Sequence, residues 1–139
     1  MYQRILVAVE NSAADRAILG HIQSLAKLTG AELLLVHVAD GFAARHFNDL
    51  QLRESDEIRD DRAYLERLAL ELSAQDLRVS TELAMGDPAT ELIRLATTRR
   101  ADLIAMSTHG HRGLNDLLRG TTVNRVRHEV KIPVLLLRA

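Results

Sequence analysis

Short apolar runs alternate along this chain with segments in which apolar residues recur every three or four positions. Four runs, at residues 4–9, 31–38, 101–107 and 133–138, are nearly continuous in apolar residues. They predict strands that are covered on both faces, as in a parallel sheet. A fifth run, at residues 77–83, alternates apolar and polar side chains, which is typical of a half-exposed strand at a sheet edge. The pattern therefore predicts five strands.

The segments between these runs carry helical signals. Ser12 is a candidate N-cap, and apolar residues follow it at helical spacing. Residues 45–73 predict one long helix with a charged face, and Asp87, which a proline follows, predicts the start of the next helix. A last helix is expected to begin at Gly120 or Thr121. Strict alternation of strands and helices indicates an α/β fold with a parallel sheet.

Composition limits the kind of protein. The 139 residues are enough for one domain, residues 1–139, and the formal net charge of -1 gives no sign of a nucleic-acid or membrane surface. There are no cysteines, which excludes disulfides and thiolate metal sites. No apolar run approaches the length of a membrane span, and the first residues lack the layout of a signal peptide. We therefore expect a cytoplasmic protein.

A glycine-rich stretch, STHGHRGLNDLLRGTT, follows the apolar run that ends at Ser107. In open parallel sheets, ligands bind outside the carboxyl ends of the strands, and glycines let several backbone amides point at one anion. Gly120, Thr121 and Thr122 would add amides at the positive end of a helix dipole. The residues alone favour neither this phosphate cradle nor an ordinary loop whose threonine caps a helix.

The whole chain resembles the universal stress protein family, whose nucleotide-binding members carry G-x-x-G-x(9)-G-[ST] after the fourth strand. Here Ser107 stands at the first motif position, and Gly110, nine residues, Gly120 and Thr121 follow. The segments ILVAVENS, LLLVHV, GDP, STHGHRGL and IPVLLLR extend the resemblance. It implies a Rossmann-like, five-stranded parallel sheet in the order 3-2-1-4-5 with helices on both faces. It also implies a homodimeric stress regulator or sensor that binds ATP, with Mg²⁺ or Mn²⁺ as the accompanying cation.

The resemblance also implies the ligand residues. The family positions at the phosphates correspond to Gly110, Gly120, Thr121 and Thr122, and those at the end of strand four to Met106 and Ser107. The positions at the end of strand one correspond to Ala8, Val9 and Glu10, and the position at the end of strand two to Val38. Three positions depart from the family pattern. Ser107 and Asn11 stand where glycine is usual, and Glu10 stands where aspartate is usual.

Other chemistry has less support. His109 and His111 are too close in sequence to form a good metal site with His37, and no carboxylate cluster accompanies them. No nucleophile elbow is present, and only Glu10 and Asp116 are acids near the glycine-rich stretch. No catalytic residue is therefore assigned. The alternatives to a binding module are a slow ATPase in the same crevice and an interaction protein of the same fold that binds no nucleotide.

The last predicted strand points to assembly. In the implied strand order it is an edge strand, yet Val134, Leu135, Leu136 and Leu137 are all apolar. A free apolar edge is an aggregation hazard, which natural proteins blunt or cover. We therefore expect two copies to pair their last strands about a two-fold axis.

Overall fold

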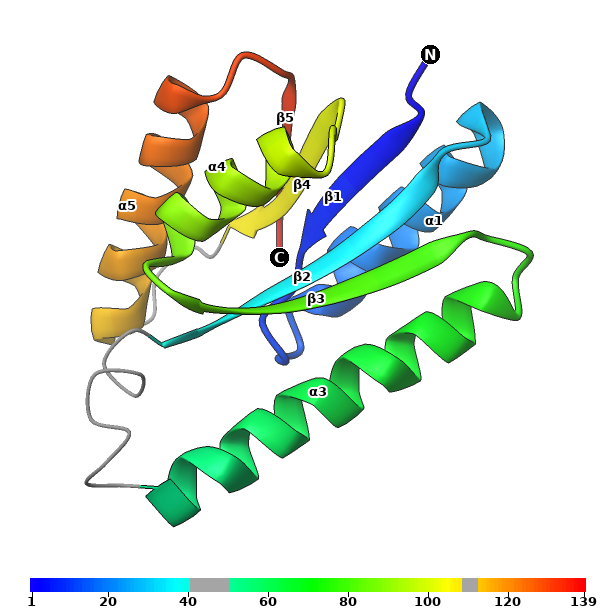
Figure 1. The fold of residues 1–139 in the computed structure, drawn as a ribbon. Coiled ribbons are helices and arrows are strands. Elements are labelled where there is room, and N and C mark those ends of the chain that lie inside the picture. The colour runs from blue at the N-terminus through cyan, green and yellow to red at the C-terminus, as the bar shows by residue number, and fades with distance from the viewer. Residues whose placement is uncertain (41–50, 109–112) are drawn as a thin grey trace.

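A computed structural model describes residues 1–40, 51–108 and 113–139 of the chain (Figure 1). In chain order its elements are β1 (Arg4–Ala8), α1 (Asp15–Thr29), β2 (Glu32–Asp40), α3 (Gln51–Ser73), β3 (Val79–Gly86), α4 (Pro88–Thr98), β4 (Leu103–Thr108), α5 (Gly113–Glu129) and β5 (Val134–Arg138). Strands and helices alternate as the hydrophobic pattern predicts. β2 and β3 continue further at their carboxyl ends than the pattern indicated.

The strands form one parallel sheet in the order β3-β2-β1-β4-β5, which confirms the predicted fold. β1 lies in the middle, with Ile5 paired to Leu33 of β2 on one side and to Leu103 of β4 on the other. The chain winds outward from β1 through β2 to β3, and then returns to place β4 on the other side. The strand order therefore reverses between β1 and β4, where open parallel sheets bind ligands.

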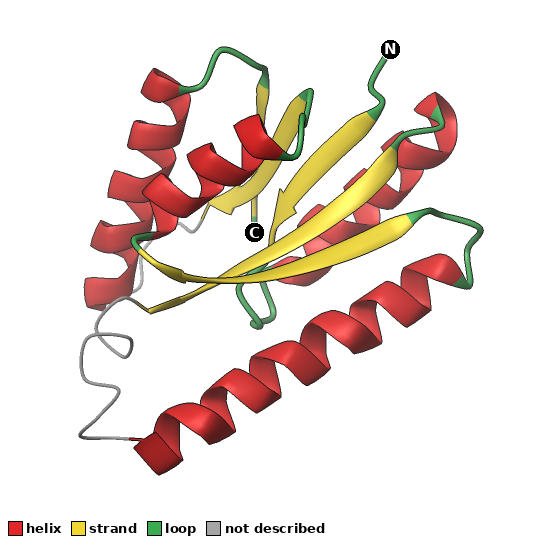
Figure 2. Cartoon of the chain, in the orientation of Figure 1, coloured by secondary structure: helices red, strands yellow, loops and turns green. Residues whose placement is uncertain are grey.

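Helices cover both faces of the sheet, with α1 and α3 on one face and α4 and α5 on the other (Figure 2). Alternate residues of β1 point into the two hydrophobic core layers, one on each face of the sheet. Ile5 and Val7 pack with α1 and α3, whereas Leu6 packs with α4 and α5, and all three are fully buried. Burial on both faces explains why the central strands are continuously apolar.

Two helix starts differ from the sequence prediction. α1 begins at Asp15, and Ser12 lies in the preceding loop, where its hydroxyl accepts a hydrogen bond from the Ala14 amide at 3.3 Å. α5 begins at Gly113, so Gly120 lies inside this helix and the predicted start there is wrong. Residues 113–119 include three leucines and an arginine, which favour helix, and one glycine costs a helix only about 1 kcal/mol.

Other predicted boundaries hold. Asp87 caps α4 by accepting a hydrogen bond from the Thr90 amide at 2.9 Å, and Pro88 is the first helical residue. α3 continues to Ser73 as predicted, while its predicted start at residue 45 lies outside the described residues. Within the described part of the chain, no helix is long and apolar enough to cross a membrane.

Candidate functional site

A pocket of about 210 Å³ lies at the carboxyl ends of β1, β2 and β4, beside the point where the strand order reverses. The ends of these strands, the first turns of α4 and one side of α5 supply its lining, which consists of Ala8, Val9, Glu10, Val36, His37, Val38, Pro88, Leu92, Met106, Ser107, Thr122 and Val123. The pocket is therefore where the fold class places a ligand.

Most of the ligand residues that the sequence predicted meet in this pocket. They are Ala8, Val9, Glu10, Val38, Met106, Ser107 and Thr122. These residues come from β1 and the segment that follows it, from β2, from β4 and from α5. The parallel sheet brings them together because strands that run in one direction end at one edge. Gly120 and Thr121 are not among the lining residues, and Gly110 lies outside the described residues.

The pocket walls are mostly apolar. Val36, Leu92 and Met106 are buried core residues of the layer that α4 and α5 cover, and Val123 of α5 packs with them. Apolar walls with a few polar groups at the rim are typical of sites for small organic ligands. The arrangement suits a small, largely apolar group with polar substituents.

Ser107 ends the buried part of β4, at the motif position where the family has glycine. Its hydroxyl donates a hydrogen bond to the Ala14 carbonyl oxygen at 3.3 Å, and its side chain is buried. The serine therefore ties β4 to the start of α1. This contact gives the departure from glycine a structural role beside the pocket.

His37 joins three elements at the rim of the pocket. Its Nδ1 lies 3.0 Å from the Val9 carbonyl oxygen of the segment after β1, and its Nε2 lies 3.1 Å from Asp61 of α3. Asp61 also accepts a hydrogen bond from the Asn11 side chain at 3.1 Å. His37 is half-buried at the rim of the pocket, where these contacts hold its ring.

Sequence reasoning missed the contribution of α3. The sequence predicted only a charged face for this helix, yet Asp61 on it binds both His37 and Asn11. Tyr64, one turn further, donates a hydrogen bond to the buried carboxylate of Asp15. Burial, together with this hydrogen bond, raises the pKa of Tyr64 well above its ordinary value. Only the spacing of Asp61 and Tyr64 on one side of the helix could have suggested a shared role.

The helix N-terminus that was predicted at Gly120 to Thr122 is wrong. Because Gly120, Thr121 and Thr122 lie inside α5, their amides are not at a helix N-terminus as predicted. Gly120 is exposed, and a Cβ at this position would meet no atom within 4 Å beyond its chain neighbours and its own helix backbone. Thr122 alone of the three lines the pocket.

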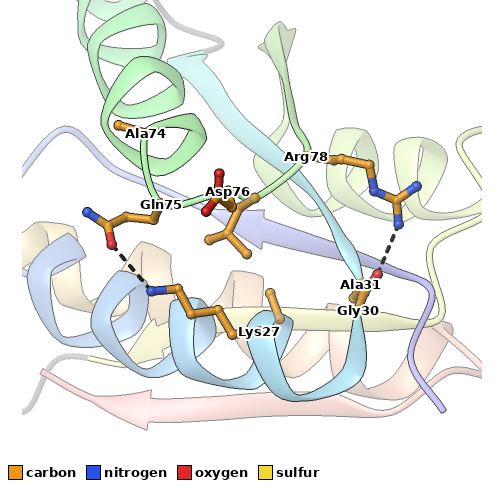
Figure 3. Close-up of a pocket in the computed structure, with 9 residues that line it drawn as sticks. Lys27, Gly30, Ala31, Ala74, Gln75, Asp76 and Arg78 are labelled. Atoms are coloured by element: carbon orange, nitrogen blue, oxygen red, sulfur yellow. Dashed lines mark hydrogen bonds between the residues drawn. The ribbon is translucent and has the colours of Figure 1, made fainter.

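A larger hollow of about 460 Å³ lies at the opposite edge of the sheet, where α1 and α3 end and β2 and β3 begin (Figure 3). Three of its polar side chains make hydrogen bonds within the fold. Lys27 donates to the Gln75 side chain at 3.3 Å, and Arg78 donates to the Gly30 carbonyl oxygen at 2.9 Å. Because it lies at the amino ends of the strands, we assign the functional site to the smaller pocket.

Metal-binding groups do not gather in the part of the chain that the structure describes: no three histidine, aspartate or glutamate side chains there lie close enough to hold a metal ion. His109 and His111 lie outside the described residues.

Known proteins are similar to this chain in sequence and in fold. A universal stress protein from Thermus aquaticus, in the QAH/OAS sulfhydrylase 3'region, is 30% identical, and the match covers 99% of this chain and all of that protein. The solved structure of MJ0577 from Methanocaldococcus jannaschii superimposes with a TM-score of 0.82 at 24% identity, over 100% of this chain and 97% of that one.

Two other solved structures are complexes. One is a universal stress protein from Archaeoglobus fulgidus with dAMP, with a TM-score of 0.72 and 18% identity over 97% of both chains. The other is a universal stress protein with cAMP, with a TM-score of 0.70 and 19% identity over 99% of this chain and 97% of that one. The model of the universal stress protein family matches residues 1–138. This chain therefore belongs to the universal stress protein family.

Proposed function

We propose that this protein binds an adenine nucleotide, ATP, in the pocket at the carboxyl ends of β1, β2 and β4, and acts in the cytoplasm as a stress sensor or regulator. The observation that carries the proposal is the place and lining of this pocket, beside the reversal of strand order and with mostly apolar walls. Two proteins of the same fold are complexes with dAMP and cAMP, and both ligands contain adenine.

The base and the ribose have matching groups in the lining. Val38, Met106 and Val123 offer apolar surface to the faces of the adenine ring. Glu10 offers a carboxylate, which accepts hydrogen bonds from ribose hydroxyls or from an amino group. Thr122 offers a hydroxyl on the side of α5. A base of this polarity would therefore find both stacking surface and acceptors.

The phosphates of ATP would extend from the pocket toward the segment between β4 and α5. Thr122 lines the pocket on that side. The family resemblance implies that Gly110, Gly120 and Thr121 also contact the phosphates. Mg²⁺ in nucleotide sites is held largely by the phosphates and water, with one or two carboxylates. The cation would therefore arrive with the nucleotide rather than occupy a site built from protein groups.

Calorimetry with ATP, AMP and GTP tests the proposal. Val38→Trp places a large ring in the pocket and should weaken ATP binding by more than tenfold, about 1.4 kcal/mol. Leu28→Trp is the matched control, because Leu28 is 84% exposed on α1 and does not line the pocket. We expect the wild type and Leu28→Trp to bind ATP more tightly than GTP. Wild-type affinity in a folded Val38→Trp protein, or no adenine nucleotide binding at all, contradicts the proposal.

We also propose that two copies pair through β5, which is an edge strand of the sheet that the described residues form. Val134, Leu135, Leu136 and Leu137 are all partly exposed, so a second copy would remove apolar surface from water. β3, the other edge, carries alternating polar residues and so is already protected. Light scattering should give a dimer at micromolar concentration for the wild type and a monomer for Leu136→Lys. A monomeric wild type rules this assembly out.

A further inference from the structure

Asp15 is a buried carboxylate beside the proposed site. It is the first residue of α1 and is 1% exposed, and among the residues that the structure describes it is the only buried ionisable side chain. A buried charge is costly unless several hydrogen bonds satisfy it. Asp15 lies outside the pocket lining, so ligand contact does not account for it.

The donors to Asp15 come from the loop between β1 and α1. Its carboxylate accepts hydrogen bonds from the amides of Glu10 at 2.9 Å, Asn11 at 2.9 Å and Ser12 at 3.4 Å. The hydroxyl of Tyr64, from α3, donates to it as well. The three amides that donate to Asp15 belong to consecutive residues, which is unusual because successive amides normally point in different directions.

The backbone of the loop explains the convergence. Asn11 has a φ of 62°, in the left-handed region that asparagine tolerates better than most residues. A left-handed residue within a tight turn brings successive amides together into a concave anion-binding nest. Here the anion is the chain's own Asp15. The nest therefore depends on this carboxylate, since the three amides would otherwise converge on no acceptor.

The same loop carries a carboxylate that lines the pocket. Glu10 is the first residue of the nest, and the Ser12 hydroxyl donates a hydrogen bond to its Oε2 at 3.0 Å. The backbone of Glu10 and the side chain that orients its carboxylate are thus both set by the loop that Asp15 holds.

We propose that Asp15, itself held by Tyr64, is a positioning residue that fixes the loop at residues 10–12 so that Glu10 faces the bound nucleotide. The inference rests on the proposed function, since it assigns a task to the loop of that same site. It also makes α3 part of the site, although Asp61 and Tyr64 are not among the residues that line the pocket. Asp61 of α3 binds Asn11 of the same loop, which adds a second attachment.

Three variants and one control test the inference. Asp15→Asn replaces one acceptor oxygen by a donor, Tyr64→Phe removes only the hydroxyl, and Glu10→Ala removes the group to be positioned. Tyr2→Phe is the control, because Tyr2 is a half-buried tyrosine that precedes β1 at the far end of the strand. All measurements are made at a temperature well below the unfolding midpoint of each variant, so that a loss of stability alone does not change the folded fraction.

The first readout is amide hydrogen exchange by NMR. Asp15→Asn should speed exchange at residues 10–12 by at least about tenfold, and Tyr64→Phe by several-fold, through local opening of the loop. The amide of Ile104 in β4 serves as reference and should not change. Unchanged exchange at residues 10–12 in both variants overturns the inference.

The second readout is ATP affinity by calorimetry. Asp15→Asn should lower affinity about tenfold, Tyr64→Phe several-fold and Tyr2→Phe not at all. If Asp15 acts through Glu10, the losses in Asp15→Asn and Glu10→Ala are strongly non-additive in the double variant. Additive losses, or wild-type affinity in a folded Asp15→Asn protein, refute the positioning role. If the wild type binds no nucleotide, the proposed function and the task of Glu10 both fail, and the exchange data alone decide whether Asp15 fixes the loop.

Discussion

Asp87 connects α4 to α5 beside the pocket, and its removal gives a quantitative test of the structure. Its carboxylate accepts hydrogen bonds from the Thr90 amide at 2.9 Å and the Thr90 hydroxyl at 2.6 Å. Arg125 of α5 donates to the same oxygen at 2.6 Å and to the Thr90 hydroxyl at 3.2 Å. Asp87→Ala therefore removes a helix cap and an interhelical ion pair in one step.

The expected loss is modest. Removing an aspartate N-cap costs about 1 kcal/mol. The ion pair adds less than about 1 kcal/mol, because the side chain of Asp87 is 56% exposed and solvent screens the charges. Together these terms predict a fall of about 1–2 kcal/mol in the free energy of unfolding. For a domain of this size that corresponds to a decrease of about 3–8 °C in Tm.

The loss should depend on pH in a defined direction. Hydrogen bonds from Thr90, and then the interaction with Arg125, hold the pKa of Asp87 below its ordinary value. A carboxyl group whose pKa is lower in the folded state stabilises the fold fully above its unfolded pKa, about 3.9, and loses that contribution as the pH falls. The difference in stability between wild type and Asp87→Ala should therefore be constant near neutral pH and shrink below about pH 4.

Urea unfolding from pH 3 to pH 7 measures this difference. Asp56→Ala is the matched control, because Asp56 is an exposed aspartate within α3 whose removal should change stability by less than about 0.5 kcal/mol. Arg125→Met, combined with Asp87→Ala in a double-mutant cycle, separates the ion pair from the cap. A loss no larger than that of Asp56→Ala, or a loss that does not shrink in acid, would falsify the assignment of the cap.

Further outcomes follow from the pocket and from α5. Gly120→Ala should raise the free energy of unfolding by about 0.5–1 kcal/mol, since a Cβ there meets no atom within 4 Å; a simultaneous loss of ATP affinity in calorimetry would show that the glycine serves the phosphates. Ser107→Gly should change affinity less than tenfold, because the serine hydroxyl is bonded to Ala14, and a hundredfold gain measured by the same method would contradict this. ATP incubated with Mg²⁺ and the protein should stay largely intact over many minutes, and steady phosphate release that Glu10→Gln abolishes would favour the ATPase alternative.

Much of the fold could be predicted from the sequence, because strands buried on both faces must be continuously apolar. Ile5, Leu6 and Val7 serve two separate core layers, and that requirement is visible in the residues themselves. The strand order came from the family resemblance and is confirmed. The start of α5 could not be predicted, since helix propensity over residues 113–119 outweighed the turn signal of the glycines.

The polar support of the site was harder to foresee than its lining. Lining residues occur at the ends of apolar runs, where the fold class already expects a ligand. Asp15 and Tyr64, in contrast, are separated by 49 positions and meet only because α1 and α3 cover the same face of the sheet. A single acid or tyrosine in a helix gives no sequence signal of such a contact, and only the three-dimensional packing reveals it.

The use of the loop amides by Asp15 also limits where phosphates can bind. The amides of Glu10, Asn11 and Ser12 form a concave donor group on the β1 side of the pocket, and the protein's own carboxylate already occupies it. A phosphate brought there would meet a buried negative charge, which is unfavourable at short range. In the proposed complex the phosphates must therefore lie on the β4 side of the pocket, away from the loop that follows β1. There Thr122 lines the pocket and the glycine-rich stretch follows the strand, so the repulsion by Asp15 and the family resemblance favour the same orientation of the nucleotide.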